Sequence, residues 1–199
     1  SSFELMETQY GEGDAAKSQS IAENYITQGV VGIFECNEGS TTGAGNAIKA
    51  SGKDGVIGVG FDKSDAILGL IDDGYLLCTM AQNPDVMGYE GVKAAVAAIG
   101  GESLGGAVTD TGVSVLTKEG SASGSDDASA DNGSATAASQ AWKIALITMD
   151  SIDQHWVTLN EGAQAKAKEL GVEVTFMSPN TKDDAQQIEC INNAVAGGY

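Results

Sequence analysis

The feature that most constrains the fold is a repeated alternation between short apolar runs and longer segments with helical hydrophobic period. Each apolar run has the length of a strand, and a helical segment follows most of them. Strands that alternate with helices in this way are typical of βαβ units, in which crossover helices join parallel strands. We therefore predict an α/β fold with a doubly wound parallel sheet.

Three such units precede residue 100. A helix is expected to begin at Asp14, which is a candidate N-cap. The uninterrupted apolar run 30–36 predicts a strand buried on both faces. The other predicted elements are strands at 3–9, 56–61, 75–81 and 113–117 and helices at 40–50, 65–73 and 85–99.

The alternation stops over residues 119–140, which are almost entirely Gly, Ser, Ala, Thr, Asp and Asn. Such a segment buries too little apolar surface to offset its chain entropy, so we predict a flexible linker. Alternating oxygen donors at 127–131 suggest a calcium loop, but Ala138 stands where that loop needs an acid. The predicted division is a first part at 1–118, the linker at 119–140 and a second part at 141–199.

The second part repeats the alternation, with strands predicted at 142–149 and 172–177 and helices at 155–170 and 183–196. In the last helix, Ile188, Ile191 and Val195 recur at helical spacing. This spacing predicts that one face of the helix belongs to the core.

The charge balance and the rare residue types exclude several functions. With 10 basic and 28 acidic residues and no arginine, the chain lacks the clustered cations that bind nucleic acid. Three separated cysteines and one histidine support neither a disulfide framework nor a metal site, so buried free thiols are expected. We find no phosphate loop, no nucleophile paired with a base and no cofactor motif, and we predict that the chain is not an enzyme.

Polar residues stand at the ends of three predicted strands. Asn37, Asp62 and Gln82 each follow or end an apolar run. Open α/β sheets bind ligands at the carboxyl ends of their strands, which makes these three residues candidate ligand contacts. Simpler roles are also open, because Asn37 and Asp62 are suited to capping the helices that follow and Gln82 to a turn before Pro84.

Four segments together resemble the type 1 periplasmic sugar-binding proteins of the ribose and galactose kind. They are VGIFECNEG at 31–39, VIGVGFD at 56–62, MAQNPDVMGY at 80–89 and KIALITMD at 143–150 with its continuation to 163. In that family a ligand lies between two flavodoxin-like lobes. Residues 142–199 resemble the start of the amino-terminal lobe and residues 3–118 most of the carboxy-terminal lobe, so the resemblance indicates a permuted or partial chain whose fold is rearranged or incomplete.

The resemblance also implies site residues. Asn37, Asp62 and Gln82 correspond to residues that hydrogen-bond sugar hydroxyls. Asp153 lies at the position of a polar contact, and His155 and Trp156 at positions where aromatic rings pack against the sugar. The family usually has an aromatic hydrocarbon at the position of His155, and this difference bears on which sugar is bound. Trp156 as a core residue and His155 as a surface residue beside Asp153 are the alternatives.

By this resemblance the chain is the solute-binding component of an ABC transporter. It would recognise a small sugar or polyol outside the cytoplasm and deliver it to the membrane subunits. The linker resembles the tether of lipoprotein members, although no lipid-bearing cysteine precedes it. The alternatives are the effector domain of a sugar-responsive transcription regulator, which would need a basic helix-turn-helix, and a rearranged fragment that binds nothing.

Each lobe of the family has the strand order 2-1-3-4-5, in which the first strand is central. Residues 1–118 lack this first strand, so the strand at 3–9 would have no neighbour beside 30–36. One hypothesis is that 142–149 fills this place beside 30–36 and completes a single sheet. The competing hypotheses are two incomplete lobes and association with a second chain that supplies the missing strands. The oligomeric state is not predicted.

Overall fold

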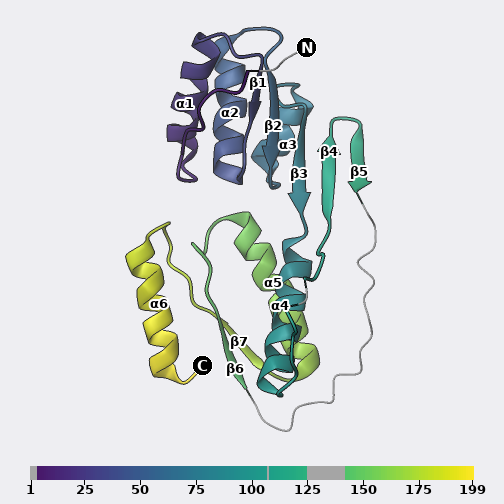
Figure 1. Cartoon of the computed structure of the whole chain (residues 1–199), viewed down its shortest axis with the longest axis vertical. Coiled ribbons are helices and arrows are strands. Elements are labelled where there is room, and N and C mark those ends of the chain that lie inside the picture. Colours follow the sequence, from purple (N-terminus) through teal and green to yellow (C-terminus); the bar gives the residue numbers. More distant parts are fainter. Residues whose placement is uncertain (1–3, 107, 125–141) are drawn as a thin grey trace. The chain divides into compact units, whose positions relative to one another are not determined.

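A computed structural model describes residues 4–106, 108–124 and 142–199 (Figure 1). The chain divides into two compact units. The first unit comprises Ser1–Gln82 and Val113–Ser125, and the second comprises Asn83–Gly112 and Asp126–Tyr199.

The first unit contains a five-stranded sheet in the order β1-β2-β3-β4-β5. The first three strands are parallel, and β4 and β5 are added antiparallel. The α/β class with a mainly parallel sheet is therefore confirmed. The strands are β1 (Gly32–Phe34), β2 (Ile57–Phe61), β3 (Cys78–Gln82), β4 (Val113–Thr117) and β5 (Gly120–Gly124), and the helices are α1 (Ala15–Thr27), α2 (Glu38–Ser51) and α3 (Asp65–Asp72).

The helices of the first unit begin at side-chain caps. Asp14 Oδ1 accepts a hydrogen bond from Lys17 N at 2.7 Å, which confirms the predicted cap of α1. Ser64 caps α3 through Ile67 N. The cap of α2 is Asn37, which belongs to the candidate site described below.

The core of the first unit lies between its helices and one face of the sheet. Glycines in β2 allow this close approach: a Cβ atom at Gly58 would lie 2.8 Å from Ile48 Cδ1, and one at Gly60 would lie 2.8 Å from Thr41 Oγ1. α2 therefore packs directly on the backbone of β2. The two buried clusters are Ala22, Ile26, Ile33, Ala44, Ala47 and Ile48, and Ile67, Leu70, Ile71 and Leu76.

Three predictions for this unit are wrong. Residues 4–10 are exposed and form no strand, because β1 is the edge of the described sheet and pairs with β2 alone. The run 30–36 yields only a three-residue strand, and it is not buried on both faces, since Phe34 is 59% exposed. Cys36 is likewise exposed rather than a buried thiol.

The predicted linker overlaps a hairpin. Gly120–Gly124 forms β5, which pairs with β4 in the register Val113 to Gly124. The small residues of this segment give no strand pattern in the sequence, but its backbone pairs with β4. Residues 125–140, including the segment considered as a calcium loop, lie outside the described residues.

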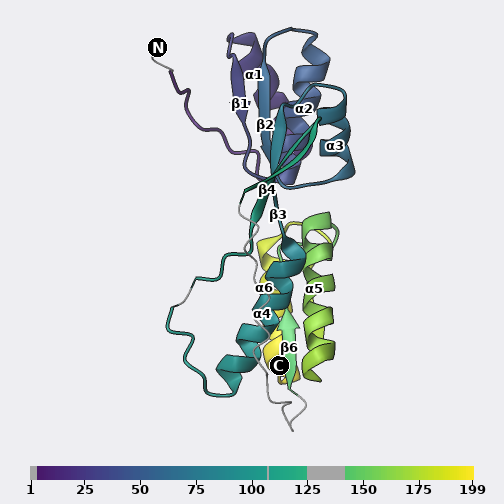
Figure 2. The same ribbon diagram turned by 90° about the vertical axis from the view of Figure 1, so that its right-hand side faces the viewer.

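The second unit has a two-stranded parallel sheet and three helices. α4 and α5 run side by side (Figure 2), and their backbones approach closely: a Cβ atom at Gly88 would lie 2.9 Å from Ala163 N, and one at Gly162 would lie 2.8 Å from Asp85 Cα. The elements are β6 (Lys143–Leu146), β7 (Glu173–Phe176), α4 (Pro84–Ile99), α5 (Gln154–Leu170) and α6 (Asp184–Gly197). Their buried cluster is Val92, Ala163, Ala167 and Val174.

These units differ from the predicted division. Residues 83–112, including α4, group with the second unit because α4 packs against α5. In the described part of the chain, β6 pairs with β7 and β1 with β2, so the single sheet joining 142–149 to 30–36 is not formed.

The last helix is the least buried of the three helices described in the second unit. Ile188 is 57% exposed and Val195 74%, and Ala194 is the one buried residue of α6. The prediction that the stripe at 188, 191 and 195 belongs to the core is wrong, because a two-stranded sheet offers little surface beyond that covered by α5. Among the described helices, none is both long and apolar enough to cross a membrane.

Candidate ligand-binding site

Three predicted site residues lie at one edge of the sheet in the first unit. Asn37 follows β1, Asp62 follows β2, and Gln82 is the last residue of β3. Because these strands are parallel, their carboxyl ends meet at the same edge. The structure therefore brings the three positions together, as expected for a ligand edge.

Asn37 caps α2. Its Oδ1 accepts from Ser40 N at 2.9 Å, and its own N–H donates to Ser40 Oγ at 3.3 Å. The capping alternative is thus confirmed for this residue. The cap uses the amide oxygen, and the amide nitrogen of Asn37 remains a donor beside the first turn of the helix.

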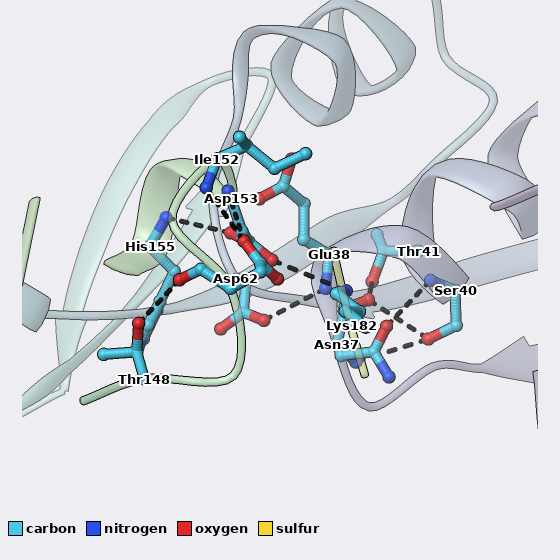
Figure 3. Close-up of polar contacts among 11 residues, drawn as sticks. Asn37, Glu38, Ser40, Thr41, Asp62, Thr148, Ile152, Asp153, His155 and Lys182 are labelled. Carbon is cyan, nitrogen blue, oxygen red and sulfur yellow. Dashed lines mark hydrogen bonds and ion pairs between the residues drawn. The ribbon is translucent and has the colours of Figure 1, made fainter. Parts of the chain in front are cut away.

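Asp62 has a different role from the cap that the sequence suggests, because Ser64 caps the following helix. Asp62 Oδ2 instead accepts from Glu38 N at 3.0 Å, at the start of α2 (Figure 3). Glu38 is the first residue of that helix, where the partial positive charge of the helix N-terminus stabilises a carboxylate. The capping alternative for Asp62 is wrong in the form proposed.

The backbone of Asp62 is held in the left-handed region at φ 70°. Its N–H donates to Met80 O at 2.9 Å, and its carbonyl accepts from Thr79 Oγ1 at 2.7 Å. A non-glycine residue in this region is uncommon, and such strain concentrates at functional sites. The neighbouring strand β3 therefore fixes the direction of the Asp62 side chain.

Sequence reasoning missed Thr41, which is fully buried. Thr41 Oγ1 accepts from Phe61 N at 2.9 Å and lies 2.8 Å from Asn37 O. This hydroxyl connects the end of β2 to the loop before α2. The available signal was a threonine in a helix of small residues. Thr41 packs against Gly60, where a Cβ atom would lie only 2.8 Å from Thr41 Oγ1.

Gln82 is half-buried and pairs with Val113 of β4. In the second unit, Asn83 Nδ2 donates to Thr111 O at 2.9 Å, and Pro84 opens α4. The alternative role for Gln82 was a turn contact before Pro84. The side chain that makes a hydrogen bond there is Asn83.

In the second unit, Asp153, His155 and Trp156 gather at the start of α5. Asp153 Oδ1 accepts from His155 N at 3.0 Å and caps the helix, while its Oδ2 lies 3.8 Å from Lys182 Nζ (Figure 3). The rings of His155 and Trp156 meet edge to face with centroids 4.7 Å apart. Both side chains are half-buried, and Trp156 lies outside the buried cluster of this unit.

Asp150 is a second residue that sequence reasoning missed. It is 1% exposed, and its Oδ1 accepts from Ile152 N at 3.0 Å and from Asp153 N at 2.8 Å. Thr148 Oγ1 donates to Asp150 O at 2.6 Å. This buried carboxylate therefore shapes the loop that presents Asp153. Its position at the end of an apolar run was the one available signal.

The chemistry of both groups is that of binding. Carboxylate, amide and aromatic side chains recognise hydroxyl groups and apolar ring faces. In the described part of the chain, no three His, Cys, Asp or Glu side chains gather as ligands for a metal ion.

A family model described as a periplasmic binding protein domain matches residues 1–103, just over half of the chain. The chain belongs to this family. The match contains the segments at 31–39, 56–62 and 80–89, so the resemblance to this family is confirmed, and with it the type of fold.

Curated relatives of this periplasmic binding protein domain include ribose import binding proteins. RbsB of Escherichia coli is 32% identical over 104 residues, which are 51% of this chain and 35% of the relative. RbsB of Bacillus subtilis is 32% identical over 96 residues, 47% of this chain and 31% of the relative. The domain thus spans about a third of the length of these relatives.

Solved structures show the same likeness. A solute-binding protein of an ABC transporter from Agrobacterium vitis, with bound D-fucose, gives a TM-score of 0.53 at 30% identity and covers 57% of this chain and 40% of that one. A carbohydrate transporter solute-binding protein from Agrobacterium radiobacter, in complex with D-arabinose, gives a TM-score of 0.51 at 35% identity. The match covers 55% of this chain and 38% of that one. These relatives are binding proteins, in agreement with the prediction that the domain is not an enzyme.

Proposed function

We propose that this domain binds a small sugar or polyol as the solute-binding component of an ABC transporter. The observation that supports it best is the geometry of Asp62, whose strained backbone is fixed by β3 and whose carboxylate lies at the ligand edge of the sheet. The likeness to ribose import proteins and to structures with bound D-fucose and D-arabinose supports the same class of ligand.

The side chains of the first unit suit sugar hydroxyls. A hydroxyl both donates and accepts, so it needs acceptors such as the Asp62 carboxylate and donors such as the amides of Asn37 and Gln82. Because Glu38 N and the loop before α2 already orient Asp62 and Asn37, little side-chain entropy is lost on binding.

The group in the second unit is proposed for the same class of ligand. The Trp156 ring is proposed to offer an apolar face to a sugar ring, and its edge-to-face contact with His155 helps to hold the ring in place. Asp153, already held by the N-terminus of α5, is proposed as an acceptor of hydroxyl hydrogen bonds.

Relatives of this family serve import, and we extend the proposal to partners and location. The domain would act outside the cytoplasm and deliver its sugar to the membrane subunits of a transporter. Attachment to the membrane through a lipid is part of this proposal. The regulator alternative is not favoured, because the relatives named above are transport proteins.

The test is calorimetric titration of the full chain with ribose, arabinose, fucose, galactose, tagatose and xylitol. Asp62→Asn is the informative variant, because asparagine tolerates the left-handed backbone and removes only the charge. We expect one sugar to bind at micromolar strength and Asp62→Asn to weaken it at least tenfold. The matched control is Asp65→Asn at an exposed position of α3, which should not change the affinity.

Two outcomes would overturn the proposal. One is the absence of binding across the whole panel by a chain that circular dichroism shows to be folded. The other is a sugar whose affinity is the same for Asp62→Asn as for the unchanged chain. For the second group, Trp156→Ala should lose affinity and Trp156→Phe should restore most of it.

A further inference from the structure

The strands of the second unit stop pairing just before its candidate sugar-binding group. Their backbone ladder extends to the hydrogen bond that Met177 N donates to Leu146 O at 2.9 Å. Beyond it, Thr148 N donates to a side chain, Ser178 Oγ, at 2.8 Å. A continued parallel ladder would supply this acceptor from the backbone. The Ser178 hydroxyl therefore joins the two strand ends at the point where their backbones separate.

Ser178 begins a continuous chain of hydrogen bonds that leads to the start of α5. Thr148 Oγ1 donates to Asp150 O at 2.6 Å, so the 2.9 Å contact between Thr148 Oγ1 and Ser178 Oγ is donated by Ser178. Asp150 Oδ1 accepts from Asp153 N at 2.8 Å, and Asp153 Oδ1 accepts from His155 N at 3.0 Å (Figure 3). The strand end at Ser178 is thus connected to Asp153 through Thr148 and Asp150.

The middle of this chain of hydrogen bonds is shielded from water. Thr148 is 6% exposed and Asp150 is 1% exposed. A buried donor that loses its protein acceptor has no solvent to replace it, so breaking such a bond is costly. The hydrogen bonds of Thr148 and Asp150 therefore leave few alternative conformations to the loop 148–153.

Two more residues of the segment after β7 contact the same loop. Asn180 Oδ1 accepts from Ser151 Oγ at 3.0 Å. Lys182 Nζ lies 3.8 Å from Asp153 Oδ2. Asn180 and Lys182 are exposed, whereas Ser178 is half-buried, and exposed polar contacts contribute little because water competes for their groups. Ser178, which bonds to the buried part of the loop, is therefore the principal contact.

We propose that Ser178 is a positioning residue for the sugar-binding group of the second unit, because it holds the loop that presents Asp153. This inference rests on the proposed function and assigns no ligand contact to Ser178 itself. A loop that is already fixed loses little conformational entropy when a sugar binds. Removal of the Ser178 hydroxyl leaves Thr148 N without its acceptor and loosens the loop, which the sugar must then order.

Calorimetric titration of the full chain and its variants, with the same panel of sugars and xylitol, measures the effect on affinity. Ser178→Ala should weaken binding by about fivefold or more, and Ser178→Thr, which retains the hydroxyl, should restore most of the affinity. Because Ser178 acts through Asp153, Ser178→Ala should cause little further loss in a chain that already carries Asp153→Ala. An undiminished loss in that background would overturn the proposal.

Val174→Ala is the matched control, because it removes buried apolar atoms from β7 without touching the chain of hydrogen bonds. It should lower the stability of the second unit and leave the affinity unchanged. Equal losses of affinity in Ser178→Ala and Val174→Ala would mean that Ser178 is merely structural. If Ser178→Ala does not fold, Ser178→Cys provides the decision, since a thiol has nearly the same shape and is a weaker acceptor.

Hydrogen exchange of the sugar-free chain separates this inference from the proposed function. The amides of Ile152 and Asp153, which donate to Asp150 Oδ1, should exchange faster in Ser178→Ala, while those of α4 keep their rates. Faster exchange without binding of any sugar would overturn the proposed function and leave the hold of Ser178 on the loop supported. Unchanged exchange at these two amides would overturn the inference even if a sugar binds.

Discussion

The helices α2 and α6 are alike in local design and opposite in burial. Each has 14 residues, a side-chain N-cap and a left-handed glycine at its carboxyl end. Seven residues of α2 are buried, but only Ala194 of α6 is. Caps and apolar period therefore determine where a helix forms, whereas the neighbouring elements determine how much of it is buried.

The difference arises from what each helix meets. α2 lies between α1 and β2, and its small residues allow close contact on both sides. α6 has a stripe of larger apolar residues that remains largely exposed. Its carboxyl end is attached through a hydrogen bond of 3.0 Å between Tyr199 Oη and Thr175 Oγ1 of β7.

The largest expected effect comes from one substitution made in both helices. Ile48→Ala in α2 leaves a cavity in the core and should lower the free energy of unfolding by about 3 kcal/mol. Ile188→Ala in α6 changes an exposed side chain and should alter it by less than about 0.5 kcal/mol. Urea unfolding measures both, and equal losses would show that α6 is packed.

The second prediction uses two glycines of α4. Gly88→Ala pushes a methyl group into the backbone of α5 and should destabilise the second unit by about 1–3 kcal/mol. Gly91→Ala, where a methyl group meets nothing within 4 Å, should stabilise it by about 0.5–1 kcal/mol through better helix propensity. Thermal unfolding followed by circular dichroism should show opposite shifts, and shifts of the same sign would contradict the close packing of α4 on α5.

The third prediction concerns the features that the two helices share. Asp183 Oδ1 accepts a hydrogen bond from Gln186 N at 2.9 Å, and Asp183→Ala removes this cap of α6. Asn37→Ala removes the corresponding cap of α2. Each should cost about 1 kcal/mol, because a cap acts locally. Helix content and urea unfolding are the measurements. A negligible cost at Asp183 would mean that α6 is frayed and not merely exposed.

The smallest expected effect is a dependence of stability on pH that arises from Glu35, the residue after β1. Burial raises the pKa of Glu35 above its ordinary value of 4.5, and the Ser40 hydroxyl offsets part of this shift. A raised pKa in the folded state means that stability falls as pH rises above 4.5, when the buried carboxyl must ionise. Glu35→Gln should match the unchanged chain at acidic pH and exceed it slightly at neutral pH in urea unfolding. The reverse order would contradict the burial.

Local chemistry made much of the fold predictable. Asp14 marked the start of α1, and the glycines at 52, 171 and 198 mark carboxyl ends. Strand partners were not predictable, because a run such as 3–9 has the same pattern whether or not a neighbouring strand exists to pair with it. The strand at Gly120–Gly124 was missed for the converse reason, since its pairing comes from the backbone and not from an apolar pattern.

The candidate site was predictable in position and less so in detail. Strand ends located Asn37 and Asp62, because parallel strands bring their carboxyl ends to one edge. The contact between Asp62 and Glu38 N joins segments 24 residues apart and leaves no local signature. Asp150 and Thr41 act through buried hydrogen bonds to the backbone, which a pattern of residue types does not reveal.

Hydrogen exchange of the full chain, resolved along the sequence, tests the central comparison most directly. The account predicts that the backbone amides of α2 exchange slowly, with protection approaching that of global unfolding, and that those of α6 exchange through local opening at far lower cost. Equal protection of the two helices would contradict it, because α6 would then be buried against a partner as completely as α2.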